Sequence, residues 1–136
     1  MQNKEYFTPT IEDFYFGYEF GYQAPDKKWH KVTYHTNDTE KLNFIYIGPK
    51  RLQELIDKEQ VKVPYLTKEK IEAEGWIFDY NLGDFDYYIK TLNDIEYELE
   101  FCYKERININ TYKRILYQGE CKCINEFRKI IKLLGI

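Results

Sequence analysis

The sequence contains no serine, and alanine occurs only at Ala24 and Ala73. The lack of serine excludes every hydrolase that uses a serine nucleophile. The chain also lacks a glycine-rich phosphate-binding loop and the metalloprotease pattern His-Glu-x-x-His. A conventional hydrolase, kinase or metalloprotease is therefore disfavoured. We expect a protein that is not an enzyme, with no catalytic residues and no cofactor.

Membrane and disulfide features are also lacking. No segment approaches the roughly 18 consecutive apolar residues of a membrane span, and Met1 is not followed by the apolar stretch of a signal peptide. The three cysteines are an odd number, and Cys121 and Cys123 are separated by one residue. This pattern argues against a disulfide framework and for a reducing compartment. We therefore expect a soluble cytoplasmic protein without a membrane partner.

Neither sign of charge is in large excess. The chain has 20 basic and 23 acidic residues and a net charge of −3, so we expect no broad, non-specific DNA binding. A content of 43% hydrophobic and 32% charged residues is typical of a folded chain rather than a disordered one. Because 136 residues fit one domain, we expect residues 1–136 to form a single domain, with the polar residues 1–12 as an extended N-terminal arm.

Aromatic residues are abundant, since 14 Tyr, 9 Phe and 2 Trp make up 18% of the chain. Large rings favour strands over helices and supply much buried area for each residue. Tyrosine also keeps a polar tip, so its ring can sit half-exposed at a surface. The aromatic content therefore suits both a small sheet protein and a binding surface.

Alternating apolar residues predict strands along the chain. Residues 14–22 carry a ring at every even position, and Gly17 and Gly21 lie on the other face, where a backbone or ring can approach closely. Residues 29–36 and 42–47 predict two more strands, and we expect the first two strands to form a hairpin. Later strands are predicted at residues 76–80, 85–89, 95–103 and 107–117, with the last pairing antiparallel with 95–103.

Three helices are predicted from end signals and apolar stripes. Residues 50–59 follow Pro49, which suits a helix start. A second helix begins at the N-cap Thr67 and stops at Gly75, and a third covers residues 123–134 with one apolar face. The predicted fold class is α+β, with antiparallel β-sheets, two short central helices and a C-terminal amphipathic helix.

Three stretches of the sequence carry a resemblance to known proteins. They are residues 9–14 (Pro-Thr-Ile-Glu-Asp-Phe) continuing through 17–20, residues 61–71 (Val-Lys-Val-Pro-Tyr-Leu-Thr-Lys-Glu-Lys-Ile) with Gly-Trp at 75–76, and residues 117–122 with 124–127 and 133–136. In this order they resemble a family of small uncharacterised proteins encoded by crAss-like bacteriophages and related phages of Bacteroidota. The resemblance implies a phage origin and thus the cytoplasm of an infected bacterium. No activity is established across that family, so it implies no catalytic residues.

The cysteines and histidines are the first candidates for chemistry. Cys121 and Cys123 could donate two thiolates to zinc, but a closed site needs four ligands, and Cys102, His30 and His35 are distant in sequence. The two histidines are five residues apart and therefore lie on opposite faces of a strand. We expect no metal site and no histidine pair, although one histidine acting as a general base stays open.

Three glutamates share one face of the strand predicted at residues 95–103. Carboxylates as close as Glu96, Glu98 and Glu100 raise one another's pKa or bind a hard cation. The alternative is a solvated face that prevents edge aggregation, with cross-strand partners such as Arg106 or Lys113. We favour the solvated face.

The best candidate for a ligand surface lies on the strand predicted at residues 107–117. If Ile107 and Ile109 face the core, the opposite face presents polar and basic side chains. Tyr and Arg stack on a base, Arg also binds phosphate, and Asn reads a base edge. The predicted ligand-binding residues are Asn110, Tyr112, Lys113 and Arg114. The same residues also fit an ordinary exposed strand.

These observations predict a phage-encoded, non-enzymatic binding protein that antagonises a bacterial defence system. It would sequester a signalling nucleotide or block a host defence protein. A nucleotide ligand predicts a concave pocket with convergent basic and aromatic side chains at a homodimer interface, whereas a protein partner predicts an exposed apolar or acidic patch. The alternatives are a small metal-dependent nuclease or phosphodiesterase, which needs carboxylates and a histidine in one cleft, and a minor virion structural protein.

Overall fold

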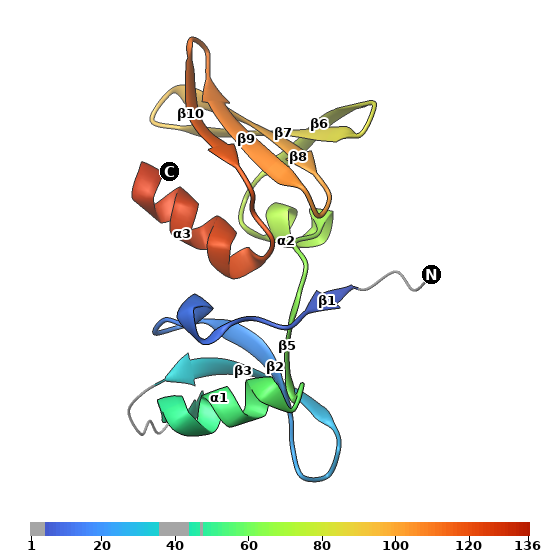
Figure 1. Cartoon of the computed structure of the whole chain (residues 1–136). Helices are drawn as coiled ribbons and strands as arrows, with labels where there is room; N and C mark the ends of the chain where they lie inside the picture. Colours follow the sequence, from blue (N-terminus) through green and yellow to red (C-terminus); the bar gives the residue numbers. More distant parts are fainter. Residues whose placement is uncertain (1–4, 36–43, 47) are drawn as a thin grey trace. The chain divides into compact units, whose positions relative to one another are not determined.

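The computed structural model describes residues 5–35, 44–46 and 48–136 of the chain (Figure 1). Contacts within the chain divide it into two compact units, Met1–Pro64 and Tyr65–Ile136. The single domain expected from the length of the chain stays a prediction. None of the helices in the described ranges has the length and apolarity to span a membrane.

The first unit is a five-stranded sheet in the order β1-β5-β2-β3-β4 with one α-helix. Its elements are β1 (Tyr6–Phe7), the 3₁₀ helix η1 (Ile11–Asp13), β2 (Glu19–Gln23), β3 (Trp29–His35), β4 (Phe44–Tyr46), α1 (Pro49–Asp57) and β5 (Val61–Pro64). The hairpin of β2 and β3 confirms the predicted pairing. The pairing of β3 with β4 is parallel, which differs from the purely antiparallel sheets expected.

The first predicted strand, residues 14–22, is wrong in its first half. Thr10 donates its backbone N–H to the Asp13 carboxylate over 2.8 Å and thereby fixes the short helix η1. A turn follows, in which Gly17 has a φ of +98° and Tyr18 donates to the Tyr15 carbonyl. The strand therefore begins only at Glu19. Residues 6 and 7 of the predicted arm form β1, which pairs with β5.

Gly21 permits the close approach that its place on the strand predicted. A Cβ at this position would lie 3.3 Å from Cγ of Lys62, which crosses over β2 from β5. The Lys62 ammonium lies 4.1 Å from the ring centroids of both Tyr6 and Trp29. This double cation–π contact links β1, β5 and β3 across the glycine.

The second unit contains an antiparallel meander in the order β10-β9-β8-β7-β6. Its strands are β6 (Ile77–Leu82), β7 (Phe85–Leu92), β8 (Ile95–Cys102), β9 (Arg106–Thr111) and β10 (Arg114–Gly119). Two-residue turns join several of them. Asn93 and Asp94, with φ of 52° and 65°, form the turn between β7 and β8, in the left-handed backbone that such hairpins require.

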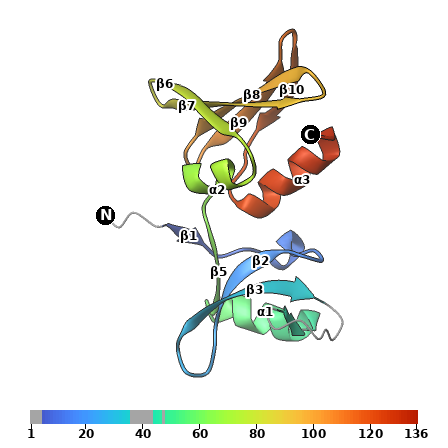
Figure 2. The same cartoon turned by 180° about the vertical axis from the view of Figure 1, so that it is seen from behind.

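Two helices cover one face of this sheet, α2 (Lys68–Ala73) and α3 (Ile124–Leu134), and both views show them on the same side (Figures 1 and 2). The Thr67 hydroxyl caps α2 as predicted, and Gly75 follows the helix with a φ of +95°. Phe127 of α3 is buried in one cluster with Leu99 and Ile109 of the sheet. The predicted C-terminal amphipathic helix is thus confirmed.

The single strand predicted at residues 107–117 is wrong, because it is a hairpin. Tyr112 and Lys113 form a two-residue turn, and Arg114 pairs back with Thr111. Neither turn residue is Gly, Asn or Asp, so the usual turn signal is missing. The predicted antiparallel pairing of β9 with β8 is confirmed.

We expect the core of the second unit to depend on Leu99, which is fully buried on the central strand β8. Leu99→Ala should lower the free energy of unfolding by about 2–5 kcal/mol through lost burial and the cavity left behind. Ile115→Ala is the matched control, because Ile115 is 70% exposed and its truncation should cost less than about 0.5 kcal/mol. Chemical denaturation of both variants checks this, and equal losses would contradict the assignment of the buried face.

Candidate functional site on the open face of the second sheet

The second sheet has one face that α2 and α3 do not cover, and we call it the open face. Alternation along the strands decides which side chains reach it, because Tyr88, Leu99 and Ile109 pair across the sheet and all point into the core. The residues between them point the other way. The open face includes Ile77, Tyr80, Leu82, Phe85, Tyr87, Ile89, Thr91, Glu96, Glu98, Glu100, Arg106, Asn108, Asn110, Ile115 and Gln118.

An aromatic pair lies on this face at the β6 side. The rings of Tyr80 and Tyr87 stack with centroids 4.4 Å apart and planes only 7° from parallel. A register shift at Asp79 places Tyr80 opposite Tyr87, so that Ile77 and Tyr80 share the open face although they are three residues apart. The face therefore presents a stacked pair of tyrosine rings beside the exposed Ile77.

Three carboxylates follow along β8, and we call Glu96, Glu98 and Glu100 the carboxylate row. Burial raises the pKa of Glu98 above its usual value, and Glu100, Asp79 and Glu96 raise it further through repulsion. Among the described residues, no member of the row forms an ion pair, so the partners suggested by the sequence, Arg106 and Lys113, do not neutralise it. The open face is therefore acidic around the carboxylate row, although it also carries Arg106.

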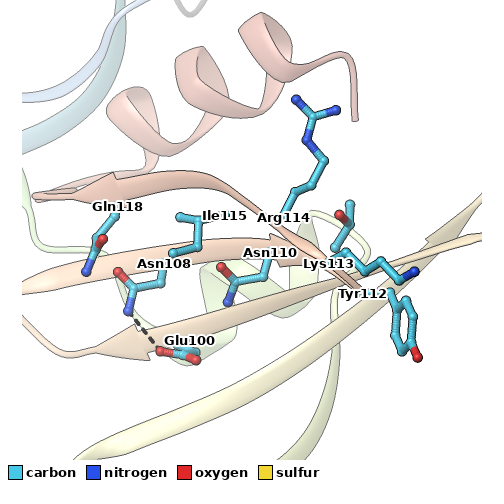
Figure 3. Close-up of a pocket in the computed structure, with 9 residues that line it drawn as sticks. Glu100, Asn108, Asn110, Tyr112, Lys113, Arg114, Ile115 and Gln118 are labelled. Carbon is cyan, nitrogen blue, oxygen red and sulfur yellow. Dashed lines mark hydrogen bonds between the residues drawn. The ribbon is translucent and has the colours of Figure 1, made fainter.

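Amide side chains continue the face on β9 and β10. Asn108 donates from Nδ2 to Oε2 of Glu100 over 2.8 Å, as Figure 3 shows, while its buried Oδ1 has no hydrogen-bond partner. Asn110 points to the same side as Asn108 (Figure 3). These amides present both donors and acceptors next to the carboxylates. The face can thus both donate hydrogen bonds to a polar ligand group and accept them from it.

Two shallow hollows adjoin the β9–β10 hairpin, with volumes of about 380 and 600 Å³. The first is lined by Glu100, Asn108 and Gln118, the second by Glu96, Glu98 and Asp94. The predicted ligand-binding residues Asn110, Tyr112, Lys113 and Arg114 line both hollows. The structure thus brings the predicted residues to one end of the open face, and their role in binding stays a prediction.

The predicted residues do not all project from one face, and this part of the expectation is wrong. Because the chain reverses at the turn, Arg114 pairs with Thr111 and takes the opposite side from Asn110. Figure 3 shows its guanidinium pointing away from both Asn110 and Tyr112. The Lys113 ammonium lies 5.6 Å from the ring centroid of Tyr112. The cations therefore do not converge on a phosphate-sized site.

The other candidates for chemistry lie elsewhere. In the described part of the chain, no three His, Cys, Asp or Glu side chains are grouped so that they could hold a metal ion. His30 is half-exposed, with Nε2 3.8 Å from the Asp26 carboxylate, while the side chain of His35 lies outside the described residues. The three cysteines are free and buried. Burial raises the pKa of the Cys121 thiol far above its usual value and makes it a poor nucleophile.

Sequence reasoning missed the stacked pair of Tyr80 and Tyr87. The alternation of Phe85, Tyr87 and Ile89 indicated one face of β7, but Tyr88 between them is also aromatic and conceals which face is buried. The register shift at Asp79 further hides the side to which Tyr80 points. Comparison of the chain with protein-family models, with curated proteins and with solved structures finds no match.

The raised pKa of Glu98 gives a pH-dependent expectation for stability. The folded state favours the protonated form of Glu98, so the charged form opposes folding once the pH rises above the ordinary glutamate pKa. Glu98→Gln should therefore raise the melting temperature at neutral pH. The gain should shrink as the pH falls through the pKa of Glu98. Thermal unfolding followed across a pH series checks this, and a lower melting temperature for E98Q at neutral pH would contradict it.

Proposed function

We propose that this protein is a non-enzymatic binding protein that holds a basic protein surface on the open face of its second unit. The observation that carries the proposal is the carboxylate row, which has no ion-pair partner among the described residues and lies beside exposed aromatic rings. An exposed patch of mixed apolar and single-sign character is typical of a protein interaction site. The complementary partner carries arginine or lysine.

Arginine is the side chain that this face suits best. Its planar guanidinium stacks on tyrosine rings and forms paired hydrogen bonds with a carboxylate. Tyr87 lies opposite Glu100 in the register of β7 and β8, and the pKa values of Tyr80 and Tyr87 are raised by partial burial and then by Glu98 and Glu100 respectively. One arginine can therefore meet both kinds of group at once.

A nucleotide fits the open face less well. Its phosphates would meet Glu96, Glu98 and Glu100, and like charges repel in partly buried surroundings. The cations that could offset this repulsion, Lys113 and Arg114, point in different directions (Figure 3). The proposal therefore favours blocking a protein over sequestering a signalling nucleotide. For a phage protein, as the sequence resemblance implies, the partner class is a bacterial defence protein with a basic surface.

An arginine-rich peptide with tyrosine spacers is a suitable probe of the proposed binding. The full chain should bind this peptide, and E98Q/E100Q should weaken binding by about tenfold or more, because paired charge contacts at an interface control its dissociation. Fluorescence anisotropy of a labelled peptide measures both affinities. A poly-glutamate peptide should not bind.

The matched control is E69Q/E72Q, which makes the same charge change on α2. This helix packs on the other face of the sheet. Its affinity for the peptide should equal that of the unaltered chain. Equal weakening by both double variants would mean that only net charge matters and would contradict a site on the open face. Thermal stabilisation by a cyclic nucleotide, without binding of the peptide, would support nucleotide sequestration instead.

A further inference from the structure

The chain carries its own complement to the carboxylate row. The turn between β9 and β10 presents Tyr112, Lys113 and Arg114, which we call the hairpin tip. Tyr112 is 92% exposed, and both cations are exposed and form no ion pair among the described residues. On a chain with a net charge of −3, this turn is therefore an exposed basic site, although its two cations point in different directions.

The tip does not neutralise the row of its own copy. The Lys113 ammonium lies over the Tyr112 ring, and the Arg114 guanidinium points toward the opposite side of the sheet from Asn110 (Figure 3). Both surfaces nevertheless border the same hollow of about 600 Å³, which Glu96, Glu98 and Lys113 help to line. The acidic and basic halves thus lie side by side at one end of the open face.

We infer that a second copy of this chain docks on the open face, with Tyr112 and Lys113 of each hairpin tip seated on the carboxylate row of the other copy. Because each copy carries both halves next to one another, a two-fold axis between facing copies makes the contact twice and closes the assembly as a dimer. Tyr112 adds aromatic contact with the stacked rings of the facing sheet, and Tyr and Arg are the residues that most often dominate interface energies.

This inference uses the face assigned in the proposed function, and it adds a consequence. The second copy and a basic partner compete for one surface, so that the dimer keeps the open face covered until a partner displaces it. The arginine-rich peptide should therefore convert dimer into monomer. The two ideas remain separable, because the hairpin tip takes part in self-association and not in holding the peptide.

Sedimentation velocity over a range of concentrations tests the inference through charge reversal. The full chain should sediment as a monomer–dimer equilibrium that weakens at high salt, because salt screens exposed charge pairs. K113E/R114E makes both tip and row acidic, and E98K/E100K makes both basic, so each variant alone should lose affinity by about tenfold or more. An equal mixture of the two variants should regain the dimer, because every tip then meets a row of opposite charge.

The mixture also controls for folding, since misfolded variants would not regain the dimer. K50E/K58E is the control for net charge, because it makes the same change at exposed positions in and just after α1 of the first unit, and it should dimerise as the unaltered chain does. Three results would each overturn the inference. They are a full chain that is monomeric at every concentration, dimers that charge reversal does not weaken, and a mixture of the two variants that stays monomeric. Peptide binding by a strictly monomeric chain would sustain the proposed function alone, and a charge-dependent dimer that ignores the peptide would sustain the inference alone.

Discussion

One-sided burial of the second sheet is the constraint on which the rest depends. A sheet has two faces, and α2 and α3 supply apolar side chains to only one of them. Tyr88, Leu99 and Ile109 take that side, and strict alternation then sends Tyr87, Glu98 and Asn110 to the other. The polar and aromatic character of the open face is therefore a direct consequence of how the core is filled.

Charge on the open face has a stability cost that the fold tolerates. Glu98 lies partly buried beside Glu96 and Glu100, and its pKa is raised first by burial and then by repulsion from Glu100, Asp79 and Glu96. A surface serving solubility alone would intersperse opposite charges, as cross-strand pairs do elsewhere in proteins. Here the cations Lys113 and Arg114 lie instead at the hairpin tip, in the turn between β9 and β10. That separation of charge favours contacts between molecules over contacts within one.

Local signals in the sequence sufficed for much of the fold. The alternation over residues 95–103 predicted β8, and Thr67 with Gly75 predicted the ends of α2, because capping and left-handed backbone depend on neighbouring residues alone. The wrong predictions of secondary structure also have local causes. Residues 14–22 alternate across the turn that follows η1 as well as across β2, and the turn at Tyr112 and Lys113 carries no Gly, Asn or Asp to mark it.

The candidate site was predictable only in part. Asn110, Tyr112, Lys113 and Arg114 were found because polar and basic residues cluster there in sequence, but the unseen reversal at residue 112 turned Arg114 to the other side. The stacked pair of Tyr80 and Tyr87 depends on strand pairing and on the register shift at Asp79. Such pairings are set by the whole sheet, and no spacing in the sequence encodes them directly.

The most direct test of the open face as the binding surface is a backbone and side-chain amide NMR titration of the full chain with the arginine-rich peptide. The account predicts that the peptide shifts the side-chain amide signals of Asn108, Asn110 and Gln118 and the backbone signals of β7 and β8. The signals of α2 and α3 should remain in place. Shifts confined to those helices or to the first unit, with the Asn108 and Asn110 signals unmoved, would contradict it.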